Sequence, residues 1–117
     1  MQRLYRIGEV GDVRVVELFL RESLDEMEFD QLNEAMLSSV DTQANGSWVL
    51  DLTGSSYMGS AVLGLLVNVR QRIKQGHGGL VLCGLSSRLE EIFQACCMER
   101  LFLIVKSRED AVEMIKR

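Results

Sequence analysis

The sequence predicts an α/β fold in which a four- to five-stranded, mostly parallel sheet is flanked by helices. Two observations predict this class. After an opening pair of strands, short apolar runs alternate with segments of helical period in the order β-β-α-β-α-β-α-β-α, which is typical of parallel strands joined by right-handed crossovers. The 117 residues are 47% hydrophobic and contain no repeat or linker, so we expect one domain over residues 1–117.

The amino-terminal third predicts two strands and a helix. Residues 2–7 and 13–20 are the strands, because the second run is rich in β-branched side chains and Gly11-Asp12 forms a turn sequence between them. Residues 25–40 then change to helical period, and acidic residues occupy the first turns, where the helix dipole favours negative charge. The apolar stripe of this helix consists of Phe29, Leu32, Met36 and Val40.

The middle of the chain predicts a strand, a helix and a second strand. Residues 48–52 are an apolar run, and residues 60–74 carry an apolar stripe at helical spacing, with basic residues in the last turns. The glycine-rich sequence Gly76-His-Gly-Gly79 ends this helix. Residues 80–83 are apolar at every position, as in a strand that is covered on both faces.

Two further helices and a strand complete the prediction. Ser86 and Ser87 are candidates to cap the first of these helices. Residues 101–105 form the last strand. Ser107, with Asp110 three residues later, resembles a capping box and opens a terminal helix.

The most informative segment joins strand 48–52 to helix 60–74. Its polar loop, residues 53–59, leaves the carboxyl end of a parallel strand, where functional loops gather in such sheets. Ser60 follows at a helix N-terminus, where backbone N–H groups point outward and favour negative charge. A serine in this position can cap the helix, act as a nucleophile or carry a regulatory phosphate.

We expect no catalytic residues in this segment. A nucleophile elbow needs small residues two positions before and after its serine, where this chain has Met58 and Val62. The one histidine, His77, follows the far end of the helix, about 20 Å from Ser60, which excludes a Ser–His pair. A P-loop is also excluded, because Ser60 stands where that motif needs lysine.

Composition excludes other classes of function. A net charge of −4 provides no basic face for nucleic acid. No apolar run reaches the length of about 18 residues that a membrane span needs, and the amino terminus lacks a signal-peptide core, so we expect a cytoplasmic protein. Cys83, Cys96 and Cys97 lack metal-ligand spacing, which favours buried free thiols over a metal or cofactor site.

Binding is the function that the loop supports best. Its hydroxyl groups are close in sequence, and Tyr57 and Met58 offer apolar area for a protein partner. A phosphate on Ser60 would change that surface by charge and bulk without unfolding the helix. The expected partner-binding residues are Ser55, Ser56, Tyr57, Met58, Gly59 and Ser60.

The segment Asp51-Leu-Thr-Gly-Ser-Ser-Tyr-Met-Gly-Ser-Ala-Val-Leu-Gly64 resembles the signature of STAS domains of the bacterial anti-sigma factor antagonist type. Gly78-Gly-Leu-Val-Leu-Cys-Gly84 and Leu101-Phe-Leu-Ile fit the same family, so the resemblance extends over nearly the whole chain. It implies a non-enzymatic protein that binds an anti-sigma factor, often one with a histidine-kinase-like ATPase fold. Such a partner typically phosphorylates the serine at the start of the helix, which is Ser60 here.

The chain departs from that signature at two positions. Gly59 replaces the usual aspartate before the serine, and Val62 replaces the usual glycine two residues after it. We expect Val62 to restrict a partner's access to the helix. Both departures favour an alternative, a STAS adaptor or scaffold module without a phosphoswitch, in a regulatory complex or as a subunit of a lipid-transport complex. The sequence leaves the oligomeric state open, a homodimer included.

Overall fold

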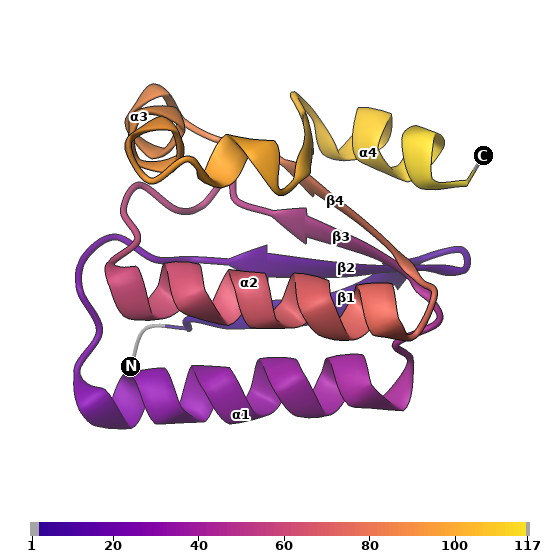
Figure 1. The fold of residues 1–117 in the computed structure, drawn as a ribbon, viewed down its shortest axis with the longest axis horizontal. Coiled ribbons are helices and arrows are strands. Elements are labelled where there is room, and N and C mark those ends of the chain that lie inside the picture. The colour runs from indigo at the N-terminus through magenta and orange to yellow at the C-terminus, as the bar shows by residue number, and fades with distance from the viewer. Residues whose placement is uncertain (1–2, 117) are drawn as a thin grey trace.

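The computed structural model describes residues 3–116, which form a five-stranded sheet flanked by helices (Figure 1). The predicted α/β class and element order are confirmed. The elements are β1 (Tyr5–Val10), β2 (Val13–Leu18), α1 (Glu26–Thr42), β3 (Ser47–Asp51), α2 (Ser60–Gln75), β4 (Gly79–Cys83), α3 (Ser87–Ala95), the 3-10 helix η1 (Met98–Arg100), β5 (Leu103–Val105) and α4 (Arg108–Ile115).

The strands lie in the order β1-β2-β3-β4-β5. β1 and β2 form the predicted antiparallel hairpin, and Gly11 in its turn has a φ of +61°, a conformation that glycine adopts without steric cost. β2, β3, β4 and β5 are parallel, so their carboxyl ends meet at one edge of the sheet. The first strand begins at Tyr5, three residues later than predicted, and residue 2 of the predicted strand lies outside the described residues.

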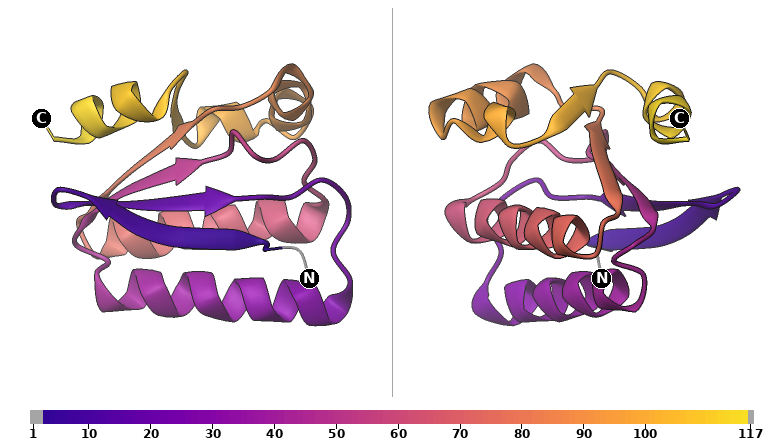
Figure 2. Two further views of the ribbon diagram at one scale, coloured as in Figure 1. Left: turned by 180° about the vertical axis from the view of Figure 1, so that it is seen from behind. Right: turned by 45° about the vertical axis from the view of Figure 1, so that its right-hand side comes forward.

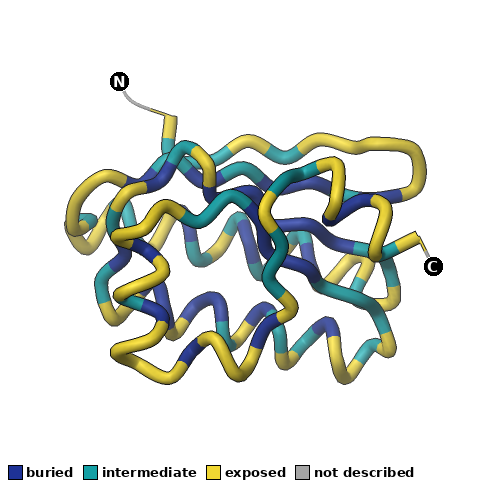
Figure 3. The backbone as a smooth tube through the Cα atoms, turned by 90° about the horizontal axis from the view of Figure 1, so that it is seen from above, coloured by how far each residue is buried: buried dark blue, intermediate teal, exposed yellow. Residues whose placement is uncertain are grey.

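Helices cover both faces of the sheet (Figure 2). α1, α2 and α3 pack on one face, where the apolar stripe of each helix joins side chains of β2, β3 and β4 in the larger core cluster. α4 packs on the other face, where Ala111 and Val112 contact a smaller cluster that contains Val15, Val49 and Val81. The three central strands are accordingly the most continuously buried part of the chain (Figure 3), as the sequence of residues 80–83 predicts for its own strand.

Local capping explains where three of the helices begin. Asp25 and Glu28 form a reciprocal capping box at the start of α1. The side chain of Ser86 accepts the Leu89 N–H at the start of α3, and that of Ser107 accepts the Asp110 N–H at the start of α4. The predicted caps at Ser86 and Ser107 are therefore confirmed, and Ser87 is the first residue of its helix.

The last strand is shorter than predicted. The sequence predicts residues 101–105, but β5 comprises only Leu103–Val105. The Leu101 N–H is bonded to the Met98 carbonyl and closes η1, and Phe102 turns into the core beside Phe93. An apolar run in the sequence does not by itself distinguish a strand from a short helical turn that is followed by a buried aromatic residue.

None of the helices between residues 3 and 116 is long and apolar enough to cross a membrane. Within the same range, no group of three or more histidine, cysteine, aspartate or glutamate side chains is arranged to hold a metal ion.

The turn after α2 depends on glycine for space. A Cβ atom on Gly78 would lie 2.3 Å from the Ala44 carbonyl oxygen and 2.6 Å from the Gly46 carbonyl oxygen, which are backbone atoms. The left-handed position of this turn belongs to His77, whose φ is 64°. The helix therefore ends through left-handed His77, and Gly78 is needed after it because the backbone of residues 44–46 lies so close.

We expect Gly78→Ala to lower the free energy of unfolding by about 2–3 kcal/mol, because the backbone must move to admit the methyl group. The matched control is Gly64→Ala on the exposed side of α2, where a Cβ meets nothing within 4 Å. That variant should raise the free energy of unfolding by about 1 kcal/mol through helix propensity. Urea unfolding at pH 7 measures both, and equal effects of the two alanines would contradict the steric explanation.

Candidate functional site

The loop of residues 52–59 leaves the carboxyl end of β3 and is fixed to the end of β2 by Ser55. The Ser55 hydroxyl accepts the Leu20 N–H at 2.9 Å and donates to the Leu18 carbonyl at 2.7 Å. The Ser56 N–H adds a bond to the Leu20 carbonyl at 2.8 Å. Ser55 is 3% exposed, so the prediction that it belongs to a partner-binding surface is wrong, and its hydroxyl holds the loop instead.

Met58 also differs from its prediction. The sequence suggested apolar area offered to a partner, but Met58 is 2% exposed and belongs to the larger core cluster. Val62 points inward as well, with 4% exposure, so the expectation that it restricts access to the helix is wrong. Met58 and Val62, on either side of Ser60, are thus buried, while Ser60 and Ala61 between them face outward.

Asp51 anchors the other end of the loop. Its Oδ1 accepts the Thr53 hydroxyl at 2.6 Å and the Thr53 N–H at 3.0 Å, and its Oδ2 accepts Nε and Nη2 of Arg108, each at 2.9 Å. Arg108 also pairs with Glu17 on β2 at 3.0 Å. The carboxylate therefore ties together β3, the loop and the first residue of α4, as expected of a satisfied polar residue at a strand end.

The electrostatics of Asp51 follow from these contacts. Burial acts to raise the pKa of the carboxyl, but the hydrogen bonds from Thr53 and the Arg108 guanidinium outweigh it, so the pKa lies below its ordinary value of 3.8. Burial, with the Asp51 charge nearby, raises the pKa of the Cys83 thiol to about 12. Cys83 is therefore an unreactive buried thiol at neutral pH. Cys96 and Cys97 are exposed, so the prediction that all the cysteines are buried is wrong for these two.

Ser60 is the first residue of α2 and is exposed. The N-cap residue is Gly59, with φ −83° and ψ 175°, and no side chain caps the helix. The interpretation of Ser60 as an ordinary N-cap is therefore wrong by one position. The first turn of α2 also carries no acidic residue, so its outward N–H groups and positive dipole end have no anionic side chain of their own.

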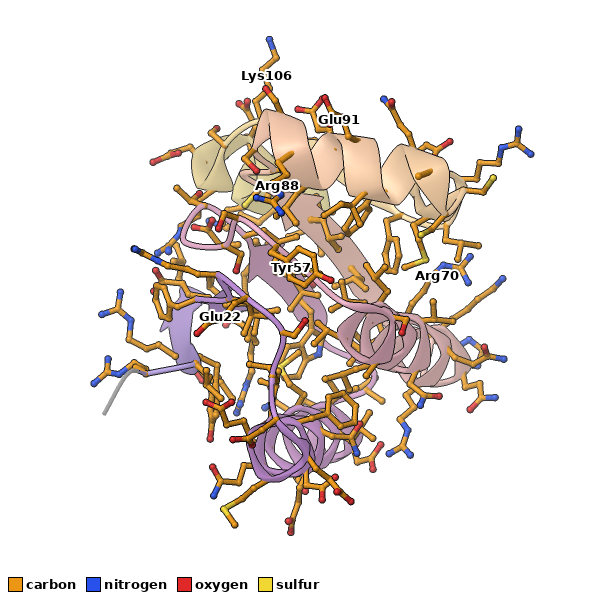
Figure 4. The ribbon with its side chains drawn as sticks, turned by 90° about the vertical axis from the view of Figure 1, so that its left-hand side faces the viewer. Glu22, Tyr57, Arg70, Arg88, Glu91 and Lys106 are labelled. Carbon is orange, nitrogen blue, oxygen red and sulfur yellow. The ribbon has the colours of Figure 1, made fainter. Side chains whose placement is uncertain are left out.

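Tyr57 lines the same pocket as Ser60, and Arg88 packs against Tyr57. The Arg88 guanidinium, from the first turn of α3, stacks over the Tyr57 ring with its central carbon 5.6 Å from the ring centroid (Figure 4). The Tyr57 hydroxyl reaches back toward the N-cap and lies 3.7 Å from the position that a Cβ atom would take on Gly59. We call the exposed and half-exposed residues of this region the Ser60 surface: Ser56, Tyr57, Gly59, Ser60, Ala61 and Arg88.

Part of the Ser60 surface, including Tyr57 and Ser60, lines a pocket of about 170 Å³. Its other wall is the connection from β2 to α1, which includes Ser23 and Glu22. Glu22 lies on the same side of the molecule as Tyr57 (Figure 4). The sequence did not single out Arg88, Arg108 or this connection. All three come to the site from distant parts of the chain, and only the parallel pairing of the strands brings them together.

His77 lies beyond the carboxyl end of α2, whereas Ser60 begins that helix. A helix of 16 residues is about 24 Å long, so Ser60 and His77 lie at opposite ends of α2. The chain therefore does not bring its one histidine to Ser60.

Comparison with known proteins places this geometry in a family. Residues 7–111 match the profile of the family described as STAS domain. A Bordetella bronchiseptica protein named as a candidate anti-sigma factor antagonist, BtrV, is 32% identical over 87 residues, which are 74% of this chain and 74% of that protein.

Solved structures share the fold. A candidate anti-sigma factor antagonist from Thermotoga maritima matches with a TM-score of 0.84 and 18% identity, over 97% of this chain and 95% of that chain. The Bacillus cell fate determinant SpoIIAA, in its phosphorylated form, matches with a TM-score of 0.67 and 18% identity, over 95% of this chain and 98% of that chain.

Stability should depend on the charge of Asp51. Because the pKa of its carboxyl is lower in the folded chain than in the unfolded chain, Asp51 contributes stability above its ordinary value of 3.8, and this contribution disappears as the pH falls through the folded-state pKa. We expect Asp51→Asn to lower the free energy of unfolding by about 2 kcal/mol at pH 7. Urea titrations between pH 7 and pH 2 should show that difference shrinking below about pH 4.

The control for this titration is Asp30→Asn, at an exposed position of α1, which we expect to change the free energy of unfolding by less than about 0.5 kcal/mol at any pH. A difference for Asp51→Asn that stays constant down to pH 2 would contradict the role of the carboxylate charge.

The missing cap at Gly59 also gives a prediction. The backbone at Gly59 is extended, and a Cβ there would make only ordinary contacts with Tyr57, so aspartate fits. We expect Gly59→Asp to be about 1 kcal/mol more stable than Gly59→Ala, because both lose the flexibility of glycine but only aspartate can accept an N–H of the first turn. Thermal and urea unfolding measure the difference, and equal stability of the two variants would show that α2 gains nothing from a cap.

Proposed function

The chain belongs to the STAS domain family, and from this premise we propose that it is an anti-sigma factor antagonist that binds its partner through the Ser60 surface and is switched by phosphorylation of Ser60. The antagonists of this family are non-enzymatic regulators. The observation that carries the proposal is the exposed position of Ser60 at the uncapped start of α2, next to the Tyr57–Arg88 pair. The proposed partner is an anti-sigma factor with a kinase-like ATPase fold.

The start of α2 suits a phosphoryl group. A kinase needs the serine hydroxyl in solvent, and Ser60 is exposed. A phosphoserine carries a charge of about −1.5 to −2 at pH 7. The N–H groups of the first turn and the positive end of the helix dipole interact favourably with that charge, by about 1 kcal/mol. No acidic side chain in the first turn opposes it, so phosphorylation leaves α2 folded and alters only its surface.

The phosphoryl group would change what a partner meets. Tyr57 and Arg88 supply an aromatic ring and a guanidinium, which are the side chains most often found at the centre of protein interfaces. A dianion beside them has to be desolvated when a partner binds, and it competes with the Tyr57 ring for the Arg88 guanidinium. Both effects weaken an interface that was complementary to the unmodified surface.

Gly59 supports a second candidate function, that of an adaptor or scaffold STAS module without a phosphoswitch. The signature has aspartate at this position, and its absence removes a charge beside the acceptor serine. Such a module would use the same surface for a constitutive contact in a regulatory or lipid-transport complex. The two functions differ in whether Ser60 is modified and in whether its modification changes binding.

We expect the cognate anti-sigma factor, isolated by affinity capture with this chain and supplied with ATP, to place one phosphoryl group on Ser60. Mass spectrometry locates the group, and isothermal titration calorimetry measures binding. Ser60→Ala should remain unmodified but bind with unchanged affinity, whereas Ser60→Glu should bind at least about tenfold more weakly, a loss of about 1.4 kcal/mol.

The matched control is Ser56→Ala, which removes an exposed hydroxyl of the same loop and should leave phosphorylation intact. Arg88→Ala tests the surface apart from the switch and should weaken binding of the unmodified chain. Unmodified Ser60, together with normal regulation in a Ser60→Ala strain, would refute the phosphoswitch and support the scaffold function. Unchanged binding by Arg88→Ala and Tyr57→Ala would refute the proposed surface.

A further inference from the structure

The outer edge of β5 is open. β5 ends the sheet and pairs with β4 alone, and no other strand between residues 3 and 116 pairs with it. Leu103, its first residue, is 61% exposed, and Leu101 just before it is 37% exposed. Natural edge strands are usually protected by charged side chains or a covering element, and this edge instead presents apolar side chains.

A groove of about 400 Å³ runs beside this edge, between the second half of α2 and residues 101–103. Its floor contains the apolar side chains of Ile73, Leu80 and Phe102, and its helix side carries Arg70 and Lys74 (Figure 4 shows Arg70). The Arg70 Nε donates to the Leu101 carbonyl, which holds the segment that enters β5 against α2.

The groove is basic although the chain as a whole is acidic. No aspartate or glutamate lines it, and within residues 3–116 neither Arg70 nor Lys74 has a carboxylate within 4.0 Å. The net charge of the chain is −4, whereas the lining of this groove includes two basic side chains and no acidic one. A groove with a cationic rim is complementary to a segment that carries carboxylates on the side that faces it.

We propose that this groove and the outer edge of β5 bind an extended acidic segment of a partner protein, which adds to the sheet as a strand beside β5. Backbone hydrogen bonds to the open edge would supply affinity, and alternate side chains would supply specificity. The carboxylates of one face would reach Arg70 and Lys74 over the groove, and the apolar side chains of the other face would pack beside Leu103, which shares its face of the sheet with Val105. A second copy of the chain is a poor occupant, because it would place one basic groove against another.

The site is separate from the Ser60 surface. The groove includes Gly78 and His77 beyond the end of α2, whereas Ser60 begins that helix, and the helix between them is about 24 Å long. An acidic segment in the groove therefore leaves the Ser60 surface free. The proposal does not depend on phosphorylation of Ser60, and each can fail without the other.

The probe is the synthetic peptide acetyl-Val-Glu-Val-Glu-Val-amide, titrated into the full ¹⁵N-labelled chain and followed by NMR. We expect the largest shifts and a slowing of amide exchange at residues 101–105 and 70–78. The same peptide with lysine in place of glutamate should bind at least about tenfold more weakly, because its charges oppose Arg70 and Lys74. A version N-methylated along one backbone edge keeps the side chains but loses the strand donors, and it should also lose at least about tenfold in affinity.

Lys74→Glu should weaken the acidic peptide about tenfold, and the matched charge reversal Lys116→Glu, beside the turn at Gly11, should leave its affinity unchanged. Unchanged spectra at millimolar peptide, or equal affinity for the lysine peptide, would overturn the acidic-segment proposal. Equal affinity of the N-methylated peptide would overturn strand addition. Sedimentation equilibrium that shows a dimer abolished by Leu103→Glu, a side chain on this edge, would assign the edge to a second copy and overturn the proposal as well.

Discussion

The carboxylate of Asp51 is the contact on which the position of the candidate site depends. It stands at the last residue of β3, where the backbone stops pairing with β2 and β4 and the loop toward α2 begins. Its two oxygens hold Thr53 in the loop and Arg108 at the start of α4, and Arg108 reaches on to Glu17 of β2. One buried anion thereby fixes the loop relative to both faces of the sheet. The free-energy cost of removing this carboxylate from water is offset because each of its oxygens has hydrogen-bond partners.

This anchoring determines which residues remain available at the surface. Asp51 fixes the start of the loop, Ser55 fixes its middle to the end of β2, and Met58 buries its side chain in the core before α2 begins. Between these fixed points only short stretches face solvent. Ser56, Tyr57 and Ser60 are therefore presented on a backbone with little freedom, so a partner that binds there spends little conformational entropy on ordering them.

The sequence predicted what is encoded locally. Helical period, glycine turns and the capping residues Ser86 and Ser107 act within a few positions, so they specify the elements and their order. It did not predict which loop residues are buried, because Ser55 and Met58 face inward through contacts with β2 and the core. Arg88 and Arg108 were missed for the same reason. An isolated arginine carries no local signal, and these two reach the site only because β4 and β5 lie beside β3 and carry α3 and α4 with them.

Gly59 leaves the start of α2 without a side-chain cap. An aspartate at that position would accept an N–H of the first turn and add a negative charge beside Ser60. Its carboxylate would then cap the helix whether or not Ser60 is phosphorylated. With glycine at this position no side chain caps the helix. The backbone of Gly59 is extended, a conformation that any residue adopts, so the backbone does not require glycine there. The N–H groups that a cap would have used therefore have no side-chain acceptor. A phosphoryl group on Ser60 would then meet the N–H groups and the positive dipole end of a first turn that contains no carboxylate, and the nearest acidic wall is Glu22 across the adjoining pocket, so its charge is tolerated by the helix and felt mainly by the partner.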